Sequence, residues 1–399
     1  MKTLTRALAL YATFALLAAS TLAASGNQLK NHPSPYLAMH GNDPVAWKDW
    51  APVALAQAKR EGKLVFVSIG YFACHWCHVM QRESYQNAEI AAFLNKHFVS
   101  VKVDRELEPA LDARMIAFAE ATRGAAGWPL NVFLTPEGHS LYAVLYEPPQ
   151  DFFGVLQRLQ KLWTEDRAKL TQLARQEAVK ASGPGKPVVD RAQAQRYGQA
   201  VVAGALSLAD MIHGGFGEQS KFPSVPQLDF LLSQYAATKH AKVGEFLTLT
   251  LNQMAAVGLH DHLGGGFYRY TVDQNWKTPH FEKMLYDNAL LARLYLRAAR
   301  VMARPEYEAL ARRTLDFMTR ELRDPSGALI ASLSAVDEQG VEGGYYLWQK
   351  PQLAALLTPA ERALFEAAWN LTDPPPFEDG YVPLADQSPA ELAKRLGVS

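Results

Sequence analysis

Short apolar runs alternate with stretches of helical periodicity over the first 163 residues. The apolar runs have the length of strands, and they cover residues 63–70, 98–103, 130–134 and 141–146. Apolar residues at helical spacing predict helices over residues 52–61, 74–80, 85–98, 109–122 and 151–163. Helices that connect strands in this way indicate an α/β domain with crossover connections.

The pattern becomes helical in the second half of the chain. Helices are predicted over residues 191–212, 226–239, 243–259, 281–302, 306–322, 351–357 and 360–369. Glycine-aromatic turns separate several of them and begin at Gly214, Gly264 and Gly343. Lys221 follows the first turn and Lys277 the second, each shortly before a proline, which indicates a weak internal repeat.

Helical hairpins joined by glycine-rich loops are typical of an α/α toroid. A closed ring of six hairpins needs on the order of 300 residues, whereas about 210 are present here. We therefore expect an incomplete toroid. Its open side would expose apolar helix faces, which favours a partner or self-association.

The N-terminus has the features of an export signal. Lys2 and Arg6 precede an apolar run, and small residues follow it, which predicts a signal peptide over residues 1–24. The alternative is an uncleaved anchor, because about 18 apolar residues can nearly cross a bilayer. No later stretch of the sequence is long and apolar enough to span a membrane, so we expect a periplasmic or secreted protein.

Changes in composition divide the remaining chain into two domains. The glycine- and proline-rich residues 181–189 read as a linker between an α/β domain over residues 25–180 and a helical domain over residues 190–399.

Cys74 and Cys77 are the only cysteines in 399 residues, and they follow the first predicted strand directly. A C-x-x-C pair between a strand and a helix is typical of a redox dithiol. The helix N-terminus favours a thiolate at Cys74, while His75 adds positive charge and the intervening His75-Trp76 pair tunes the potential. Cys77 would then be the resolving thiol. We expect a centre more oxidising than a general reductase, with no cofactor beyond this redox-active disulfide.

The order of elements around the cysteines is that of the thioredoxin fold. In that fold a cis-proline precedes the third core strand and lies against the active-site sulfurs, and Pro129 occupies this place in the sequence. Pro129 is therefore predicted to present substrate, with Trp128 beside it. The alternative is an ordinary turn proline.

Two other types of site fit the cysteine motif. Cys74-x-x-Cys77-His78 also matches the attachment motif for c-type haem, but that motif does not need a strand before it or a proline downstream. A structural zinc site usually takes four ligands from two separated pairs, and no second cysteine pair exists. Both haem and metal are disfavoured.

Charge composition argues against nucleic acid as a partner. Lys and Arg together number 40, and Asp and Glu together also number 40, with no basic cluster. The expected partner is a protein that supplies thiols or disulfides.

The helical domain has one dense polar segment that could bind a sugar. Tyr270 and Trp276 could stack on sugar rings, and His280, Glu282 and Asp287 could supply polar contacts. The alternative is structural, with Glu282, Lys283 and Asp287 as charges at the start of a helix and His280 buried or capping. The spacing does not show which two carboxylates would face each other, as a glycosidase requires.

Several motifs resemble the spermatogenesis-associated protein 20 family. They are Asn31-x-x-Ser34-Pro35-Tyr36-Leu37, Cys74-His75-Trp76-Cys77-His78-Val79-Met80-x-x-Glu83-Ser84, Val103-Asp104-Arg105-Glu106, Gly127-Trp128-Pro129-Leu130-Asn131-Val132-Phe133-Leu134-Thr135-Pro136 and Pro279-His280-Phe281-Glu282-Lys283-Met284-Leu285-Tyr286-Asp287-Asn288. The resemblance implies a thioredoxin-like domain fused to an α/α toroid similar to N-acylglucosamine epimerases and six-hairpin glycosidases.

The sequence departs from the family pattern at several places. Residues 143–148 replace a Gly-Gly-Thr-Tyr-Phe-Pro run, residues 335–337 lose one carboxylate of an Asp-Ala-Asp run, and the family usually continues well past Gly397. These departures leave the dithiol intact. We therefore expect an exported thiol-disulfide oxidoreductase, with a carbohydrate-binding or sugar-isomerising protein as the alternative.

Overall fold

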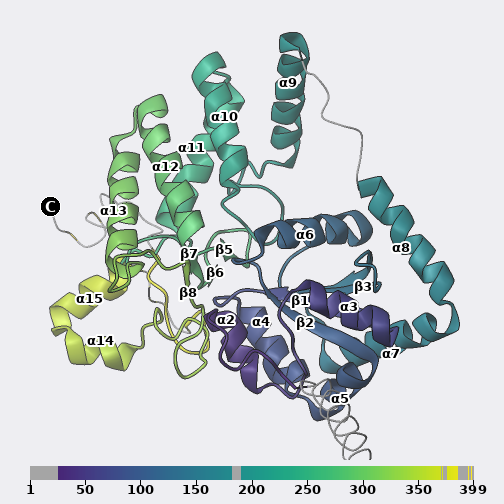
Figure 1. Cartoon of the computed structure of the whole chain (residues 1–399). Coiled ribbons are helices and arrows are strands. Elements are labelled where there is room, and N and C mark those ends of the chain that lie inside the picture. The colour runs from purple at the N-terminus through teal and green to yellow at the C-terminus, as the bar shows by residue number, and fades with distance from the viewer. Residues whose placement is uncertain are drawn as a thin grey trace, which may run out of the picture. The chain divides into compact units, whose positions relative to one another are not determined.

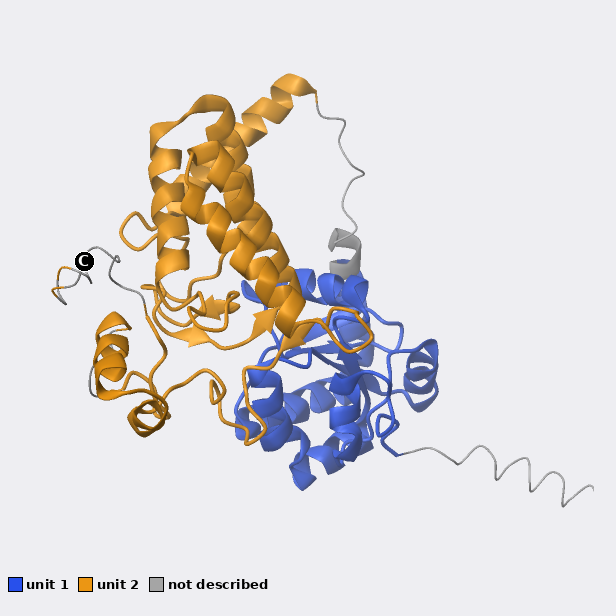
Figure 2. Cartoon of the chain, turned by 90° about the vertical axis from the view of Figure 1, so that its left-hand side faces the viewer, with its two compact units in different colours: residues 1–186 blue, residues 187–399 orange. Residues whose placement is uncertain are grey.

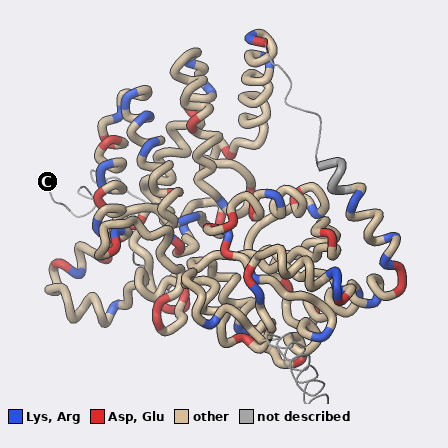
Figure 3. The backbone as a smooth tube through the Cα atoms, in the orientation of Figure 1, with Lys and Arg blue, Asp and Glu red and all other residues tan. Residues whose placement is uncertain are grey.

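The computed structural model describes residues 26–181, 190–369, 371, 375–384, 394 and 397 (Figure 1). The chain divides into two compact units, residues 1–186 and 187–399, which Figure 2 colours separately. The predicted signal peptide lies outside the described residues. Lys and Arg positions are interspersed with Asp and Glu positions along the backbone of both units (Figure 3), in agreement with the balanced composition.

A four-stranded sheet forms the centre of the first unit. Its strands are β1 (Leu64–Gly70), β2 (Phe98–Asp104), β3 (Leu130–Leu134) and β4 (Ser140–Val144), in the spatial order β2-β1-β3-β4. β1 runs parallel to β2 and antiparallel to β3, and β3 runs antiparallel to β4. The sheet is therefore mixed, with one parallel pair and two antiparallel pairs. A crossover connection predicts parallel neighbours, and β1 and β2 are the only pair of this sheet that has them.

The first unit also contains seven α-helices, one 3₁₀-helix and one π-helix among its described residues. They are α2 (Pro35–Met39), the 3₁₀-helix η1 (His40–Asn42), α3 (Pro52–Glu61), α4 (His75–Met80), the π-helix η2 (Gln81–Tyr85), α5 (Ala88–His97), α6 (Pro109–Arg123), α7 (Pro149–Glu165) and α8 (Arg167–Ala181). Gly62 ends α3 in a left-handed conformation that glycine adopts without strain. Helix α8 has no counterpart among the helices expected from the sequence.

The side chains of β1 alternate between two differently packed faces. Val65, Val67 and Ile69 join one apolar core with residues of α3 and α6. Phe66 points to the other face, where its ring lies 5.2 Å from that of Phe133 on β3 and 5.8 Å from that of Phe152 on α7. Because a strand has a period of two, Ser68 and Gly70 share the face of Phe66, and β1 carries this face to the cysteine motif.

The second unit is built mainly from helices. They are α9 (Arg191–Leu208), α10 (Val225–Thr238), α11 (Ala241–Ala256), α12 (Leu285–Met302), α13 (Pro305–Glu321), α14 (Lys350–Leu356) and α15 (Pro359–Ala368). Helices α10 to α13 pack around one core of buried Leu, Val, Phe and Tyr side chains (Figure 1). Two short antiparallel ribbons pair β5 (Tyr270–Thr271) with β6 (Pro279–His280), and β7 (Lys283–Met284) with β8 (Ser332–Leu333). This is the toroid-type helical architecture expected from the sequence.

The glycine turns repeat one hydrogen-bonding pattern. In each turn an aspartate side chain accepts backbone N–H groups two to four residues later, and the three residues are Asp210, Asp261 and Asp337. In the first two turns a buried lysine completes the loop: Lys221 Nζ lies 2.9 Å from Asp210 and Lys283 Nζ lies 2.6 Å from Asp261. The internal repeat is therefore present in the structure.

The equivalent lysine of the second turn was identified wrongly from the sequence. Lys283, and not Lys277, is the counterpart of Lys221. The separation from the aspartate is 11 residues in the first turn and 22 in the second. The longer second loop contains the β5-β6 ribbon, so matching by the proline that follows each lysine selected the wrong residue.

The predicted helix over residues 281–302 also begins later than expected. Helix α12 starts at Leu285, because Lys283 and Met284 are held extended by pairing with β8. Lys283 and Glu282 are therefore not charges of a helix start, and Lys283 pairs with Asp261 instead of Asp287.

Candidate active site

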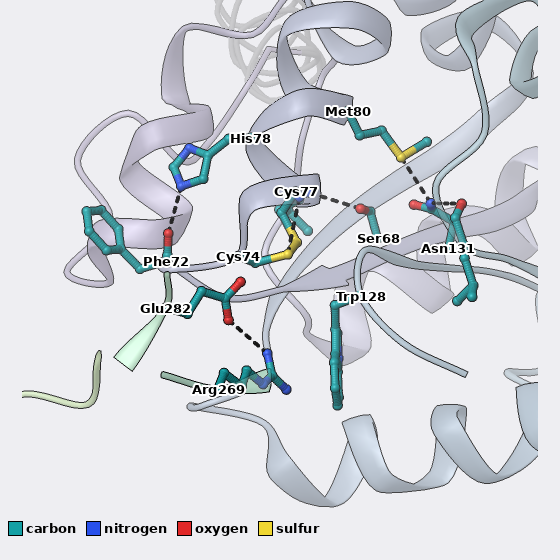
Figure 4. Close-up of a disulfide and its surroundings, with 12 residues drawn as sticks. Ser68, Phe72, Cys74, Cys77, His78, Met80, Trp128, Asn131, Arg269 and Glu282 are labelled. Atoms are coloured by element: carbon teal, nitrogen blue, oxygen red, sulfur yellow. Dashed lines mark hydrogen bonds and ion pairs between the residues drawn. A yellow bond between two sulfur atoms is a disulfide. The ribbon is translucent and has the colours of Figure 1, made fainter. Parts of the chain in front are cut away.

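The two cysteines form a disulfide at the junction of β1 and α4 (Figure 4). Their Cα atoms lie 5.3 Å apart. Cys74 is the N-cap of α4, and its Sγ accepts a hydrogen bond from the backbone N–H of Cys77 at 3.2 Å. A thiolate at Cys74 would keep this bond and would also lie at the positive end of the helix, so the geometry favours Cys74 as the nucleophile.

Pro129 lies beside the same end of β1. The Trp128–Pro129 peptide bond is cis, as predicted, and Pro129 is buried. The register pairs Leu130 with Ile69, which places Pro129 next to Gly70, where β1 leads into the cysteine loop. The strand order and the cis-proline together give the arrangement expected for a thioredoxin-like site.

Aromatic residues surround the disulfide segment. Trp76 is 44% exposed, and its ring centroid lies 5.5 Å from that of His75 and 4.8 Å from that of Tyr146. The hydroxyl of Tyr146 donates to Glu83 at 2.6 Å, and this bond raises the pKa of Tyr146 to about 12. Trp76 therefore offers an exposed apolar surface next to the reactive sulfurs.

Trp128 is held by a cation and a carboxylate. The Arg105 guanidinium lies 4.0 Å from the Trp128 ring centroid, and the indole N–H donates to Asp112 at 2.8 Å. Arg105 also hydrogen-bonds Asp112 at 3.2 Å, and its backbone N–H donates to the carbonyl of Gly70. These contacts fix the residue before the cis-proline and bring a positive charge to this edge of the site.

Polar residues behind β1 form a network that sequence reasoning missed. Ser68 lies 2.8 Å from the hydroxyl of Tyr85 and accepts a hydrogen bond from Lys102 Nζ at 2.9 Å. Tyr85 also donates to Asn131, whose amide contacts the sulfur of Met80 at 3.2 Å (Figure 4). Burial lowers the pKa of Lys102 to about 7. The signal was present in the VDRE motif, which Lys102 precedes, but a lysine in a strand gave no reason to expect burial.

The N-terminal arm, residues 27–50, is attached to this network through Asp43. Its carboxylate accepts hydrogen bonds from His40 at 2.7 Å, Trp47 at 3.0 Å and Gln81 at 3.0 Å. Burial by itself would raise the pKa of Asp43, but these donors hold it below its usual value. Burial and the charge of Lys102 lower the pKa of His40 to about 3, so the imidazole is neutral and donates through Nδ1.

The predicted sugar-contact residues of the second unit are only partly brought together. Tyr270 and His280 pair across β5 and β6, with ring centroids 4.8 Å apart, and His280 lies 3.3 Å from Glu342. Burial and the charge of Arg269 lower the pKa of His280 to about 4. Glu282 forms an ion pair with Arg269 at 3.0 Å, as Figure 4 shows. Asp287 lies in the first turn of α12.

Trp276 does not offer a stacking face, so this prediction is wrong. Its side chain is fully buried in the core of the second unit, and its indole N–H donates to the carbonyl of His213 at 2.9 Å. The loop places the backbone of Trp276 at a positive φ of 61°, which turns the side chain inward. The polarity of the surrounding segment had suggested the opposite.

The described residues include no group of three or more His, Cys, Asp or Glu side chains that could hold a metal ion. None of the described helices is long and apolar enough for a membrane span.

Residues 26–181 match a family model of DsbH-type thioredoxins, described as a protein of unknown function, DUF255. The first unit is therefore a thioredoxin-like domain that carries a C-x-x-C disulfide. Over most of its length the chain is similar to spermatogenesis-associated protein 20, with 37% identity to the rat protein over 357 residues and 36% to the human protein over 358 residues.

The matches cover 84% and 83% of this chain but 45% and 44% of the rat and human proteins, so the chain spans less than half the length of these relatives. Among solved structures, a DsbH oxidoreductase is similar at 23% identity and a TM-score of 0.25. The alignment covers 30% of this chain and 85% of the oxidoreductase chain. A sugar epimerase from a ruminal bacterium aligns with 49% of this chain and 50% of its own, at 18% identity and a TM-score of 0.31. Likenesses this distant do not identify an activity.

Proposed function

We propose that this protein is an exported thiol-disulfide oxidoreductase. The observation that carries the proposal is the Cys74–Cys77 disulfide at a helix N-terminus, beside the cis-proline Pro129. No other cysteine exists in the chain, so this pair does not belong to a set of stabilising cross-links.

The reaction is a thiol-disulfide exchange through Cys74. In the oxidising direction, a substrate thiolate attacks Cys74 Sγ, a mixed disulfide forms, and the electron pair of the broken S–S bond leaves on Cys77 as a thiolate. A second substrate thiolate then attacks the substrate sulfur of the mixed disulfide and releases Cys74 as a thiolate. The substrate loses two electrons and the protein gains them. Pro129 presents the substrate backbone, and the exposed ring of Trp76 contacts apolar substrate side chains.

Alkylation of the reduced protein at graded pH tests this function. A Cys74 that reacts at a pH well below its ordinary pKa of about 8.5, together with exchange with a model disulfide, is the expected result. An ordinary pKa at Cys74 and no exchange would overturn the proposal.

A carbohydrate-binding or sugar-isomerising role for the second unit has narrower support. Tyr270, His280 and Glu342 lie together, but Glu282 is engaged by Arg269 and Trp276 is buried. This alternative predicts that sugars bind near His280 and that Cys74→Ser leaves the activity unchanged. Sugar binding that is lost in His280→Ala and unaffected by reduction of the disulfide would favour it.

A further inference from the structure

The hydroxyl of Tyr36 is buried without a hydrogen-bond partner among the described residues. Tyr36 lies in α2 of the N-terminal arm and is fully buried. Leaving such a hydroxyl unsatisfied costs about 1–3 kcal/mol, so its presence calls for an explanation. The ring alone would pack equally well in a phenylalanine.

Gly70 shows what this hydroxyl faces. A Cβ atom placed on Gly70 would collide with the hydroxyl oxygen of Tyr36 and would lie 2.7 Å from Cys77 Sγ. The hydroxyl oxygen and the sulfur therefore border the same small space, because each lies closer than 3.0 Å to the position of that Cβ atom. Glycine at position 70 leaves this space open, so the hydroxyl can approach the sulfur directly.

We propose that Tyr36 donates a hydrogen bond to Cys77 Sγ when the disulfide is open. This inference rests on the proposed oxidoreductase function. The sulfur of a disulfide is a weak acceptor, so a hydrogen bond to it would stabilise the oxidised protein little. When a substrate thiolate attacks Cys74, the electron pair of the S–S bond leaves on Cys77, and the Tyr36 hydroxyl stabilises this thiolate. No proton is transferred in this step.

Two features of the surroundings keep the Tyr36 hydroxyl protonated and in place. Burial, followed by the nearby Tyr85, Asp104 and Asp43, raises the pKa of Tyr36 well above its usual value. Ser34, at the N-cap of α2, donates to Asp104 at the end of β2 at 2.7 Å, which attaches the arm to the sheet. Tyr36 is thus a donor at every pH at which the protein would work.

Other charged or titratable groups also face Tyr36. Lys102 on β2 places its Nζ 5.2 Å from the Tyr36 ring centroid, and the neutral His40 ring packs edge-on at 5.2 Å. The carboxylates of Asp43 and Asp104 disfavour a negative charge on Tyr36, whereas the ammonium group of Lys102 would favour one. A variant that removes only the Tyr36 hydroxyl leaves all of these groups unchanged, so it isolates the proposed hydrogen bond.

Tyr36→Phe in the full chain tests the inference. In a Cys74→Ala background, where Cys77 is the only thiol, we expect Tyr36→Phe to raise the Cys77 pKa by about one unit, because a hydrogen bond to a charged group is lost. With both cysteines present, we expect the equilibrium constant for reduction by glutathione to fall about tenfold, which corresponds to about 30 mV. The oxidised variant should be at least as stable as the wild type.

Tyr85→Phe is the matched control. Tyr85 is equally buried, but its hydroxyl has partners in Ser68 and Asn131. Loss of the Tyr85 hydroxyl should destabilise the oxidised and reduced forms of the protein equally and leave the Cys77 pKa unchanged. An unchanged Cys77 pKa and glutathione equilibrium in Tyr36→Phe would overturn the inference. The Cys77 pKa is measurable whether or not the protein exchanges disulfides, so this failure is distinct from failure of the proposed function.

Discussion

At the scale of single residues, the two cysteines have different surroundings. Cys74 Sγ accepts the backbone N–H of Cys77 at the start of α4, whereas Cys77 faces Gly70 and the hydroxyl of Tyr36. A nucleophile needs its thiolate stabilised before attack, and a resolving cysteine needs it stabilised as a leaving group. The structure supplies a backbone donor to Cys74, and the Tyr36 hydroxyl is the proposed donor to Cys77.

Serine substitutions should separate these two roles. Cys77→Ser cannot resolve a mixed disulfide, so we expect it to accumulate a covalent adduct with a model disulfide substrate, because Cys74 remains reactive. Cys74→Ser should form little adduct, since the N-cap position, where Sγ accepts a backbone N–H, belongs to Cys74 and not to the remaining Cys77. Mass spectrometry of the unreduced proteins measures both adducts. Equal adduct formation in the two variants would contradict the assignment of Cys74 as the nucleophile.

Lys102 should make stability depend on pH. Burial lowers its pKa from 10.5 to about 7, so the unfolded chain binds more protons than the folded protein between these values. The free energy of unfolding should therefore rise as the pH increases through this window and lose this contribution as the pH falls toward 7.

Lys102→Met removes this dependence and provides the comparison. From pH 7 to 9.5, the stability of the wild type should increase relative to the variant by on the order of 2 kcal/mol. Urea denaturation at several pH values measures the difference between the two proteins. A difference that stays constant with pH would show that Lys102 titrates normally.

At the scale of elements, the arm before the first strand is part of the site. Asp43 binds His40, Trp47 and Gln81, and so connects η1 and the following loop to the π-helix that continues from α4. The hydroxyl of Tyr36, from the same arm, borders the space at Gly70 that Cys77 Sγ also borders. The arm therefore stabilises α4, the helix that carries Cys77, through its contacts with η2.

Removing the carboxylate of Asp43 should destabilise the protein strongly. Asp43→Ala leaves three buried donors without their acceptor, so we expect a loss of about 2–4 kcal/mol in the free energy of unfolding. Asp49→Ala is the control in the same arm, because Asp49 is largely exposed and its carboxylate contacts the His32 ring, at 3.3 Å, and the backbone N–H of the adjacent Trp50, at 2.7 Å. Its effect should stay below about 1 kcal/mol. Chemical denaturation distinguishes the two variants, and equal losses would contradict the supporting role of Asp43.

The sequence predicted most elements because local signals and packing agree. Strand β3 and helix α3 were placed correctly at both ends, since Pro129 precedes the strand and Gly62 terminates the helix. Gly70 could not be interpreted in the same way, because its role depends on Tyr36, which is 34 positions away in the sequence. The start of α12 failed for a related reason: pairing with β8, far along the chain, overrides local helical periodicity.

The residues that would carry the chemistry of the candidate site were predictable from the sequence. The buried residues that pack behind them were much less predictable. Cys74, Cys77 and Pro129 carry recognisable spacing, and the structure brings the ends of β1 and β3 together around them. Lys102 and Tyr36 carry no such pattern, since a lysine in a strand and a tyrosine in an arm are usually exposed or simply packed. Trp276 shows the reverse error, because a polar sequence neighbourhood concealed a core residue.

At the scale of the whole molecule, each unit has its own hydrophobic core. The first is built around the sheet and the second around α10 to α13. The proposed redox chemistry would lie entirely in the first unit, because the second contains no cysteine. The second unit is then available for another task, such as selecting the protein that exchanges disulfides with the first.

Separating the units should therefore divide catalysis from selection. Residues 26–181 produced alone should exchange with a small disulfide at a rate similar to that of the whole chain, because the site and its core are retained. Exchange with a protein client should be strongly reduced if the helical unit selects it. Loss of exchange with the small disulfide in a folded fragment would show that the second unit contributes to the chemistry itself.

The reduction potential of the Cys74–Cys77 couple decides whether this pair is an exchanging redox centre. Equilibration with defined glutathione mixtures, followed by alkylation of the free thiols, measures it in the full chain. The account predicts a potential above about −270 mV, more oxidising than that of thioredoxin, because both sulfurs are supplied with donors in the reduced form. A potential below about −300 mV, the range typical of structural disulfides, would contradict the assignment of this pair as an exchanging redox centre.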